Sequence, residues 1–285
     1  PLWLHMKYKF YEKTIYSLLK KTLGLDRGAF FPTAGAAVSP DVERFVHAAG
    51  LNIKVGYGLT ESTATVSCDR DDQVVTMGSV GRLVDKLEIK FGENNEVLLR
   101  GKTITPGYYK KEEETRAAID EEGWFRTGDA GYMKDGELYL TERIKDLFKT
   151  SNGKYIAPQM IETKFSLDKY IESVVVVANE RKFVSALIVP AFAVVEKYAE
   201  ENGIEYASRA DLCRHPEIIK VIADSIEELQ TDLAHYEKVK RFVLLPESFS
   251  MEKGELTNTL KVKRRVVYEK YAKEIEQMYA EAEQA

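Results

Sequence analysis

The sequence predicts a two-part protein that combines an α/β and an α+β architecture, and three observations support this prediction. Residues 1–73 alternate strand-like and helix-like apolar segments, which is typical of an α/β layer with a parallel sheet. Residues 74–144 change to short alternating segments with frequent glycines, which predicts a small antiparallel β-subdomain, with a barrel as one form of it. A hairpin, apolar strands and helices follow over residues 145–285, which predicts a small α+β domain of ordinary size.

The first predicted element is a basic helix over residues 4–23, which contains five lysines and one glutamate. A basic amphipathic helix can lie on an anionic membrane, or it can pack through its apolar side on protein that this chain lacks. We favour packing and keep peripheral membrane contact as the alternative.

The next segments predict a strand, a helix and a second strand. A buried strand near residues 30–33 leads into a small-residue loop. A helix then begins at Ser39-Pro40, because serine caps a helix well and proline suits the first helical position. Gly50 suits the end of this helix, and the following short strand runs into the glycine-flanked turn GYGLTE, residues 56–61.

Two hairpins are predicted at Asp135-Gly136 and Asn152-Gly153, because both dipeptides favour the positive φ of tight turns. Between them lies a run of charged residues, 142–146, which we interpret as a linker between the two domains. The acidic residues 111–122 predict a solvated surface helix. The elements expected beyond the second hairpin are a helix from Pro158, strands at 173–180 and 185–190, helices near 191–202 and 216–234, a strand at 241–249, and a charged helix over 263–283.

Composition excludes several classes of protein. The chain is 44% hydrophobic and 31% charged, and its net charge of 41 − 46 = −5 disfavours nonspecific nucleic-acid binding. Two distant cysteines and four unpaired histidines form neither a disulfide framework nor a metal-spacing pattern. With no apolar run long enough to span a bilayer and no signal-peptide pattern, we expect a cytoplasmic protein with at most peripheral membrane association.

The turn GYGLTE holds groups that suit a nucleotide phosphate and its metal. The glycines allow a close approach of the backbone, and Tyr57 offers a face for stacking. Thr60 supplies a hydroxyl, and the carboxylate of Glu61 is the kind of hard oxygen that Mg²⁺ prefers. Taken alone, a strand-ending turn with a capping threonine would look the same.

Six segments together carry a resemblance to a known family. In order along the chain they read TAGAAVSPDV, GYGLTE, GYYKKEEET, GWFRTGD, TERIKDLFKTSNGKYIAPQMIE and GELTNTLKVKRR. They resemble motifs of the adenylate-forming, AMP-binding superfamily, and within it most closely the bacterial long-chain fatty acid–CoA ligases. The resemblance implies the C-terminal part of the large N-terminal domain, over residues 1–144, followed by a hinged, mobile small domain over residues 145–285.

The resemblance also implies roles for individual residues. Asp129 would accept hydrogen bonds from the ribose hydroxyls, with Arg143 assisting, and Tyr57 would stack on the adenine ring. Thr60 would hold the α-phosphate and Glu61 the magnesium. The main chain that would border the nucleotide is that of Gly35, Ala36 and Gly58.

Lys261 would be the catalytic lysine of acyl-adenylate formation, while Lys263, Arg264 and Arg265 are interpreted as surface charges. Lys145 matches the hinge position about which the small domain of such enzymes rotates between two half-reactions, although it can also be an ordinary linker charge. After that rotation, the hairpin at Ser151, Asn152 and Gly153 would line the tunnel for coenzyme A.

The implied reaction joins a fatty acid to CoA: the acid and ATP give acyl-AMP and pyrophosphate, and CoA then displaces AMP. The family's Ser/Thr/Gly-rich phosphate loop and acyl-pocket stretch do not occur in this chain. We therefore expect a part of a longer enzyme, inactive alone without its N-terminal part. Two alternatives stay open, a non-catalytic protein that binds a nucleotide or a partner, and an adenylating enzyme whose acceptor is not CoA.

Overall fold

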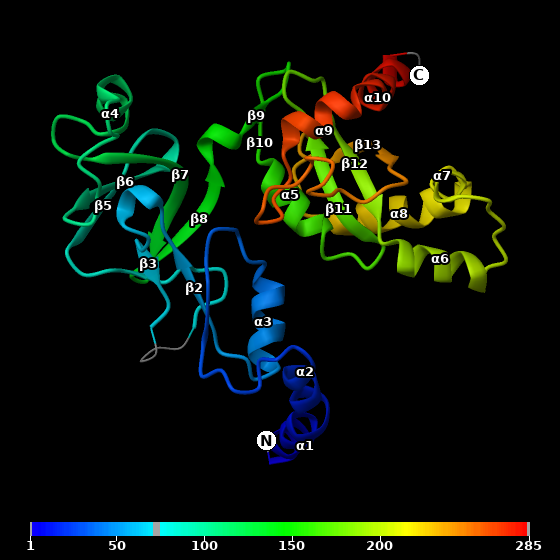
Figure 1. Ribbon diagram of the computed structural model, residues 1–285, viewed down its shortest axis with the longest axis horizontal. Coiled ribbons are helices and arrows are strands. Elements are labelled where there is room, and N and C mark those ends of the chain that lie inside the picture. Colours follow the sequence, from blue (N-terminus) through cyan, green and yellow to red (C-terminus); the bar gives the residue numbers. More distant parts are fainter. Residues whose placement is uncertain (1, 71–74, 284–285) are drawn as a thin grey trace. The chain divides into compact units, whose positions relative to one another are not determined.

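The computed structural model describes residues 2–70 and 75–283, apart from the side chains of Lys145 and of residues 281–283. The chain divides into two compact units, Pro1–Lys145 and Asp146–Ala285 (Figure 1). Each unit is described by itself.

The first unit begins with helix, as expected. Helix α1 (Leu2–Tyr11) continues through the π-helical turn η1 (Glu12–Tyr16) into α2 (Ser17–Thr22), and every residue of the three is at least partly exposed. Large apolar side chains at Leu2, Trp3, Met6 and Phe10 are more than half exposed. Packing of this helix on protein that the chain lacks, which we favour, and its contact with a membrane both stay predictions. Among the described residues, none of the helices is both long enough and apolar enough to cross a bilayer.

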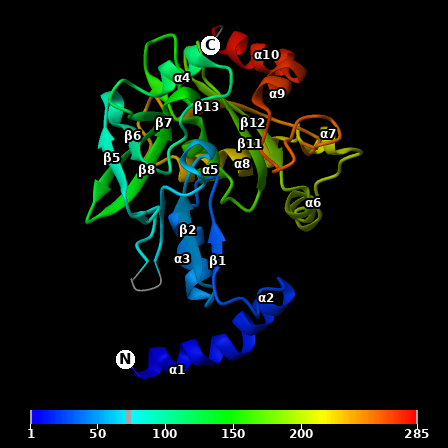
Figure 2. The ribbon, with the colours of Figure 1, turned by 60° about the vertical axis from the view of Figure 1, so that its left-hand side comes forward.

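A four-stranded sheet follows, in the order β1 (Phe31–Thr33), β2 (Ile53–Tyr57), β3 (Ser67–Cys68) and β4 (Arg82–Leu83). The β1–β2 pair is parallel, whereas β2–β3 and β3–β4 are antiparallel. Helix α3 (Pro40–Ala48) connects the parallel pair and packs against β2 (Figure 2). The prediction that the first strand is buried is wrong, because β1 lies at the edge of this sheet and Pro32 is exposed.

Helix α3 begins as the sequence predicts, with the Ser39 hydroxyl accepting a hydrogen bond from the Asp41 amide. One turn later, Glu43 is 1% exposed and accepts a hydrogen bond from the Gly78 amide at 2.9 Å. Its other carboxylate oxygen has no hydrogen-bond partner among the described residues. Burial raises the pKa of Glu43, the Gly78 hydrogen bond opposes that shift, and the charge of Asp69 adds to it.

Replacing Glu43 with glutamine is expected to raise the free energy of unfolding at pH 7 by about 1–2 kcal/mol, because a buried charge with an unpaired oxygen is costly. The raised pKa means that folded Glu43 holds its proton to a higher pH than the unfolded chain does. Its stabilising contribution is therefore complete below about pH 4.3 and is lost as the pH rises through the folded pKa. Denaturant unfolding followed by tryptophan fluorescence between pH 4 and 8 tests this.

The glutamine variant should show a flatter loss of stability with rising pH than the wild type. Glu113→Gln, at an exposed position, is the matched control and should leave the profile unchanged. A Glu43→Gln variant that is less stable than the wild type at pH 7 would contradict the prediction.

The rest of the first unit is an antiparallel sheet in the order β5 (Leu87–Phe91), β6 (Glu96–Gly101), β7 (Phe125–Lys134) and β8 (Glu137–Arg143). Over the described residues this sheet is open, with β5 and β8 at its edges. It is not a barrel, which was one predicted form of the β-subdomain. The predicted hairpin at Asp135-Gly136 is present, and both residues have positive φ. Helix α4 (Glu112–Ala118) has no buried residue and is the predicted surface helix.

The predicted linker is shorter than expected. Strand β8 extends to Arg143, which pairs with Asp129 on β7, so Glu142 and Arg143 belong to the sheet. Only a 3₁₀ turn, η4 (Ile144–Asp146), then connects the two units. The extension of β8 to Arg143 could not be predicted, because a run of charged residues on an edge strand has the same pattern in sequence as a loop.

The second unit is an α+β domain built on a three-stranded sheet in the order β11 (Ile171–Val177), β12 (Val184–Pro190) and β13 (Val239–Leu244). β11 and β12 are antiparallel, and β12 and β13 are parallel. Every residue of β12 is buried, so both faces of the central strand are covered. The surrounding elements are β9 (Phe148–Lys149), β10 (Tyr155–Ile156), α5 (Pro158–Phe165), α6 (Phe192–Glu201), α7 (Arg209–Leu212), α8 (Pro216–Leu229), α9 (Arg264–Lys270) and α10 (Ala272–Glu283).

Most of these elements match the sequence predictions in type and order, but β13 ends at Leu244 instead of residue 249, and α8 ends at Leu229 instead of near residue 234. Two further differences concern the helices. The closing helix is interrupted at Tyr271, between α9 and α10. The short helix α7 was not predicted, because four residues are too few to show a helical period.

Candidate nucleotide-binding site

Two predicted site segments follow the two parallel strands of the first unit. Gly35 and Ala36 lie in the exposed loop after β1, and Gly58, Thr60 and Glu61 lie in the turn after β2. The carboxyl ends of parallel strands meet at one edge of a sheet, which is where ligands bind in open α/β folds. The strand register, with Thr33 opposite Val55, therefore brings both segments to the same edge.

The turn after β2 is tightly constrained. A Cβ atom at Gly58 would lie 1.4 Å from the carbonyl oxygen of Ala64, so only glycine fits there. Residues Thr60–Ser62 form a 3₁₀ turn, and the next two residues, Thr63 and Ala64, both have positive φ. Left-handed backbone is unfavourable for residues with a Cβ atom and is concentrated at functional sites. The Thr60 side chain is exposed and Glu61 is half-buried at this turn.

Asp129 is the centre of a polar group whose other members are the buried Tyr57 and the half-exposed Arg143. Its Oδ2 accepts a hydrogen bond from the Tyr57 hydroxyl at 2.5 Å, and its Oδ1 lies 3.3 Å from Nε of Arg143. Tyr57 and Asp129 are each only 9% exposed. Burial, together with the charge of Asp129 and its hydrogen bond, raises the pKa of Tyr57, so the phenol stays a donor. Asp129 thus contacts both Tyr57 and Arg143, the two residues that the resemblance assigns to the same site.

The Tyr57 hydroxyl and the Arg143 guanidinium contact different oxygens of Asp129. An ionised carboxylate has about four lone-pair sites, so it is a group that can accept several hydrogen bonds at once. The Tyr57 ring, in contrast, packs in the core with Val66 and Leu99. The stacking of Tyr57 on adenine stays a prediction, and the contact that the structure adds is the one from its hydroxyl to Asp129.

Sequence reasoning missed Tyr108. Its hydroxyl donates a hydrogen bond to Oε1 of Glu61 at 2.8 Å. Burial raises the pKa of Tyr108, and the hydrogen bond and the charge of Glu61 raise it further. Tyr108 belongs to the segment GYYKKEEET, but no periodicity or spacing links a tyrosine to a glutamate 47 residues earlier.

Lys261 lies on a hairpin of the second unit. Its amide donates to Oγ1 of Thr257 at 3.0 Å, and the Thr257 amide donates to the Lys261 carbonyl at 2.8 Å. Leu260, directly before it, has a φ of +59° although it is bulky. Below the hairpin, Glu255 is 0% exposed and forms a 2.8 Å ion pair with Lys270. The Lys261 side chain is exposed on a turn whose base is anchored by that pair.

The other predicted members of the second unit lie on the hairpin between β9 and β10. The Ser151 amide donates to the Arg181 carbonyl at 3.0 Å, and Nδ2 of Asn152 donates to the Lys182 carbonyl at 3.3 Å. Gly153 alone of the three has positive φ, so the loop is not the two-residue turn expected for Asn-Gly. The Lys145 side chain lies outside the described residues, and its hinge role stays a prediction.

The interpretation of Arg264 as a surface charge is wrong. Its guanidinium forms two hydrogen bonds of 2.5 Å to the two carboxylate oxygens of Glu162 on α5. The two side chains are 26% and 17% exposed. Four basic residues among the five at 261–265 suggest a solvated helix start, but α9 begins here and its Arg264 side chain contacts Glu162 on α5. Arg265 remains on the surface, with its side chain 85% exposed.

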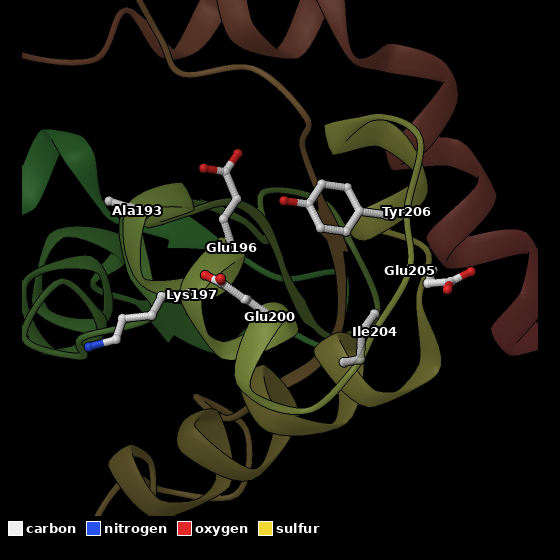
Figure 3. Close-up of a pocket in the computed structure, with 7 residues that line it drawn as sticks. All are labelled: Ala193, Glu196, Lys197, Glu200, Ile204, Glu205 and Tyr206. Carbon is white, nitrogen blue, oxygen red and sulfur yellow. The ribbon is translucent and has the colours of Figure 1, made fainter.

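The second unit also has a surface hollow of about 770 Å³, which contains none of the predicted site residues. Figure 3 shows its lining, with the Tyr206 hydroxyl directed toward the helix that carries Glu196 and Glu200. Three glutamates line it, and Glu196 pairs with Arg209 at 2.8 Å. An acidic hollow disfavours phosphate. Among the described residues there is no group of three or more His, Cys, Asp or Glu that could hold a metal ion.

Comparison with known proteins identifies the family of the chain. A family model described as AMP-binding enzyme matches residues 4–109, and one described as AMP-binding enzyme C-terminal domain matches residues 145–283. The adenylation domain of a carboxylic acid reductase from Segniliparus rugosus, solved with AMP and a co-purified carboxylic acid, has the same fold. Its TM-score is 0.70 at 21% identity, over 96% of this chain and 46% of that one. The chain therefore belongs to the adenylate-forming, AMP-binding enzymes.

Its curated relatives are more specific. Long-chain-fatty-acid–CoA ligase FadD15 of Mycobacterium bovis is 33% identical over 280 residues, covering 98% of this chain and 46% of the relative. Peroxisomal long chain acyl-CoA synthetase 7 of Arabidopsis thaliana is 32% identical, covering 95% of this chain and 41% of the relative. The chain thus spans less than half the length of these two relatives.

Proposed function

We propose that this chain is the nucleotide-binding and catalytic-lysine part of an ATP-dependent long-chain fatty acid–CoA ligase. The single observation that carries the proposal is the buried Tyr57–Asp129 pair, with Arg143 beside Asp129, next to the edge where two parallel strands end. The fatty acid–CoA ligases among its relatives support the choice of substrate class.

In this proposal Asp129 receives the ribose hydroxyls. A carboxylate can accept two hydrogen bonds from a vicinal diol, and the Tyr57 hydroxyl holds it in place for that task. Gly35, Ala36 and Gly58 provide backbone that can approach the nucleotide without side-chain obstruction. Thr60, exposed at the turn, would donate its hydroxyl to the α-phosphate.

The residues present fit Mg²⁺ held mainly by phosphate and water. Mg²⁺ in nucleotide enzymes is bound by one or two carboxylates plus substrate phosphates. Glu61 supplies one half-buried carboxylate, of which one oxygen accepts the Tyr108 hydrogen bond. When bound, the ion would neutralise phosphate charge as pyrophosphate leaves.

Lys261 would act in the first half-reaction, in which a carboxylate oxygen of the fatty acid attacks the α-phosphorus of ATP and pyrophosphate leaves. An ammonium aimed at the developing negative charge lowers the barrier to such a displacement. In the second half-reaction the CoA thiol attacks the acyl carbonyl, and AMP leaves. Ser151, Asn152 and Gly153 would then line the CoA tunnel, after rotation about Lys145.

Replacing Lys261 with alanine in the full-length product of the gene tests this function. We expect fatty-acid-dependent adenylate formation to fall by about 100- to 1000-fold, the usual cost of losing one electrostatic stabiliser. Thioester formation from supplied acyl-adenylate and CoA should change by less than about threefold, because the lysine acts in the first half-reaction only. Each half-reaction is measured separately, by pyrophosphate release and by thioester formation.

Lys263→Ala is the matched control, because Lys263 is also exposed and lies two residues away. It should leave both half-reactions unchanged. Adenylate formation without thioester formation would instead identify an acceptor other than CoA. AMP binding without either half-reaction would favour the non-catalytic alternative. We further expect the 285-residue chain to form no acyl-adenylate alone, and detection of fatty-acid-dependent AMP release by it would contradict that.

A further inference from the structure

Tyr108 and Glu61 are joined by more than one bond between their segments. Besides the hydroxyl–carboxylate bond of 2.8 Å, the Thr105 amide donates to the Glu61 carbonyl at 2.7 Å. The Thr63 hydroxyl donates to the Thr103 carbonyl, also at 2.7 Å. The segment 103–108 therefore holds the turn 60–63 through both the main chain and the side chain of Glu61.

Tyr108 is itself fixed at its backbone. Its amide donates to Oγ1 of Thr115 at 2.9 Å, and that hydroxyl donates to the Lys111 carbonyl at 2.7 Å. The preceding residue, Gly107, has a φ of +146°, and a Cβ atom there would lie 2.5 Å from Cγ2 of Thr115. The start of α4 and the segment before it are thus packed too closely for Tyr108 to move freely.

We propose that Tyr108 is a positioning residue that orients the Glu61 carboxylate toward the metal-bound phosphates of the nucleotide. This inference rests on the proposed function. Oε1 of Glu61 accepts the phenol hydrogen bond, which restricts the rotation of the carboxylate and leaves Oε2 outside that bond. Groups that hydrogen-bond a metal-ligating side chain commonly contribute a factor of 10 to 100 in metal affinity.

The next residue in the chain offers a matched control. Tyr109 has the same side chain, is 85% exposed, and contacts Lys110 with its ring. Tyr108→Phe and Tyr109→Phe each remove one hydroxyl and leave the ring. Only the first removes a hydrogen bond to Glu61.

The test measures ATP binding to the full-length product of the gene by calorimetry, with Mg²⁺ and with EDTA. For Tyr108→Phe we expect an affinity loss of about tenfold for ATP with Mg²⁺ and no change with EDTA. Tyr109→Phe should match the wild type in both conditions. Glu61→Gln, as the reference, should remove the advantage that Mg²⁺ gives.

A merely structural role for Tyr108 would weaken binding equally with Mg²⁺ and with EDTA, and that result would overturn the inference. So would a Tyr108→Phe variant that binds like the wild type. Absence of ATP binding by the wild type would instead overturn the proposed function, and the inference with it.

Hydrogen exchange in the 285-residue chain gives a second readout without any ligand. Tyr108→Phe should speed exchange of the Thr105 amide several-fold, because the partner segment loses one of its three bonds. Tyr109→Phe should leave this amide protected. Equal exchange in the two variants would also overturn the positioning role.

Discussion

Replacing Asp129 with alanine is expected to weaken AMP binding by about 100-fold or more. The substitution removes the carboxylate that is proposed to accept both ribose hydroxyls, and hydrogen bonds to charged groups contribute about 1.5–3 kcal/mol each. It also leaves the buried Tyr57 hydroxyl without its partner and Arg143 without its counter-charge. Titration calorimetry of the wild type and the variant with AMP measures the loss.

A second substitution separates binding from folding. Asp129→Asn keeps the shape and an oxygen that can accept the Tyr57 hydrogen bond, so it should fold like the wild type and still bind AMP weakly. Asp85→Ala, at an exposed position in the same unit, should change nothing. If Asp129→Asn binds AMP with wild-type affinity, the charge of Asp129 has no part in ribose binding.

The second large effect is expected at the Glu162–Arg264 pair of the second unit. Arg264→Ala should lower the free energy of unfolding of this unit by about 3 kcal/mol, because it leaves a largely buried carboxylate uncompensated. Glu162 also accepts the Val176 amide at 2.7 Å, so it joins α5, β11 and α9. The guanidinium lies 5.5 Å from the ring centroid of Phe148 on β9 and would be lost from that contact too.

The positions of the tryptophans allow this prediction to be measured cleanly. Both tryptophans of the chain, Trp3 and Trp124, lie in the first unit, so their fluorescence reports on it alone. Circular dichroism reports on both units. For Arg264→Ala the dichroism transition should shift to lower denaturant while the fluorescence transition stays in place. Arg265→Ala, one residue further along on the surface, should shift neither, and an equal shift in both variants would refute the role of the buried pair.

Local features of the fold could be predicted from sequence because their causes are local. The Ser39 cap and the Asp135-Gly136 turn depend on residues that are neighbours in the chain, and their types report the backbone directly. The apolar run of β12 likewise reports a strand that is covered on both faces.

Contacts between distant segments could not be predicted in this way. Arg264 and Glu162 are 102 residues apart, and Tyr108 and Glu61 are 47 apart. No period or dipeptide encodes such pairs, since they exist only once the strands and helices have packed. The resemblance places Asp129 and Arg143 in one site. It also predicts that the ring of Tyr57 stacks on adenine, but it says nothing of the Tyr57 hydroxyl, so the hydrogen bond from that hydroxyl to Asp129 could not be predicted.

The strand register at Arg143 has a mechanical consequence. Arg143 is paired with Asp129 across the sheet, and the 3₁₀ turn that leads out of the first unit begins at the next residue. Any rotation of the connecting backbone would therefore act, within one peptide bond, on the strand pair that carries Asp129, the residue proposed to bind the ribose. If the connection rotates as proposed, and if nucleotide binding stiffens this strand pair, then binding and rotation would each change the free energy of the other by the same amount. The conformation of this turn would then influence how tightly the nucleotide binds, and the bound nucleotide would influence the conformation of the turn to the same degree.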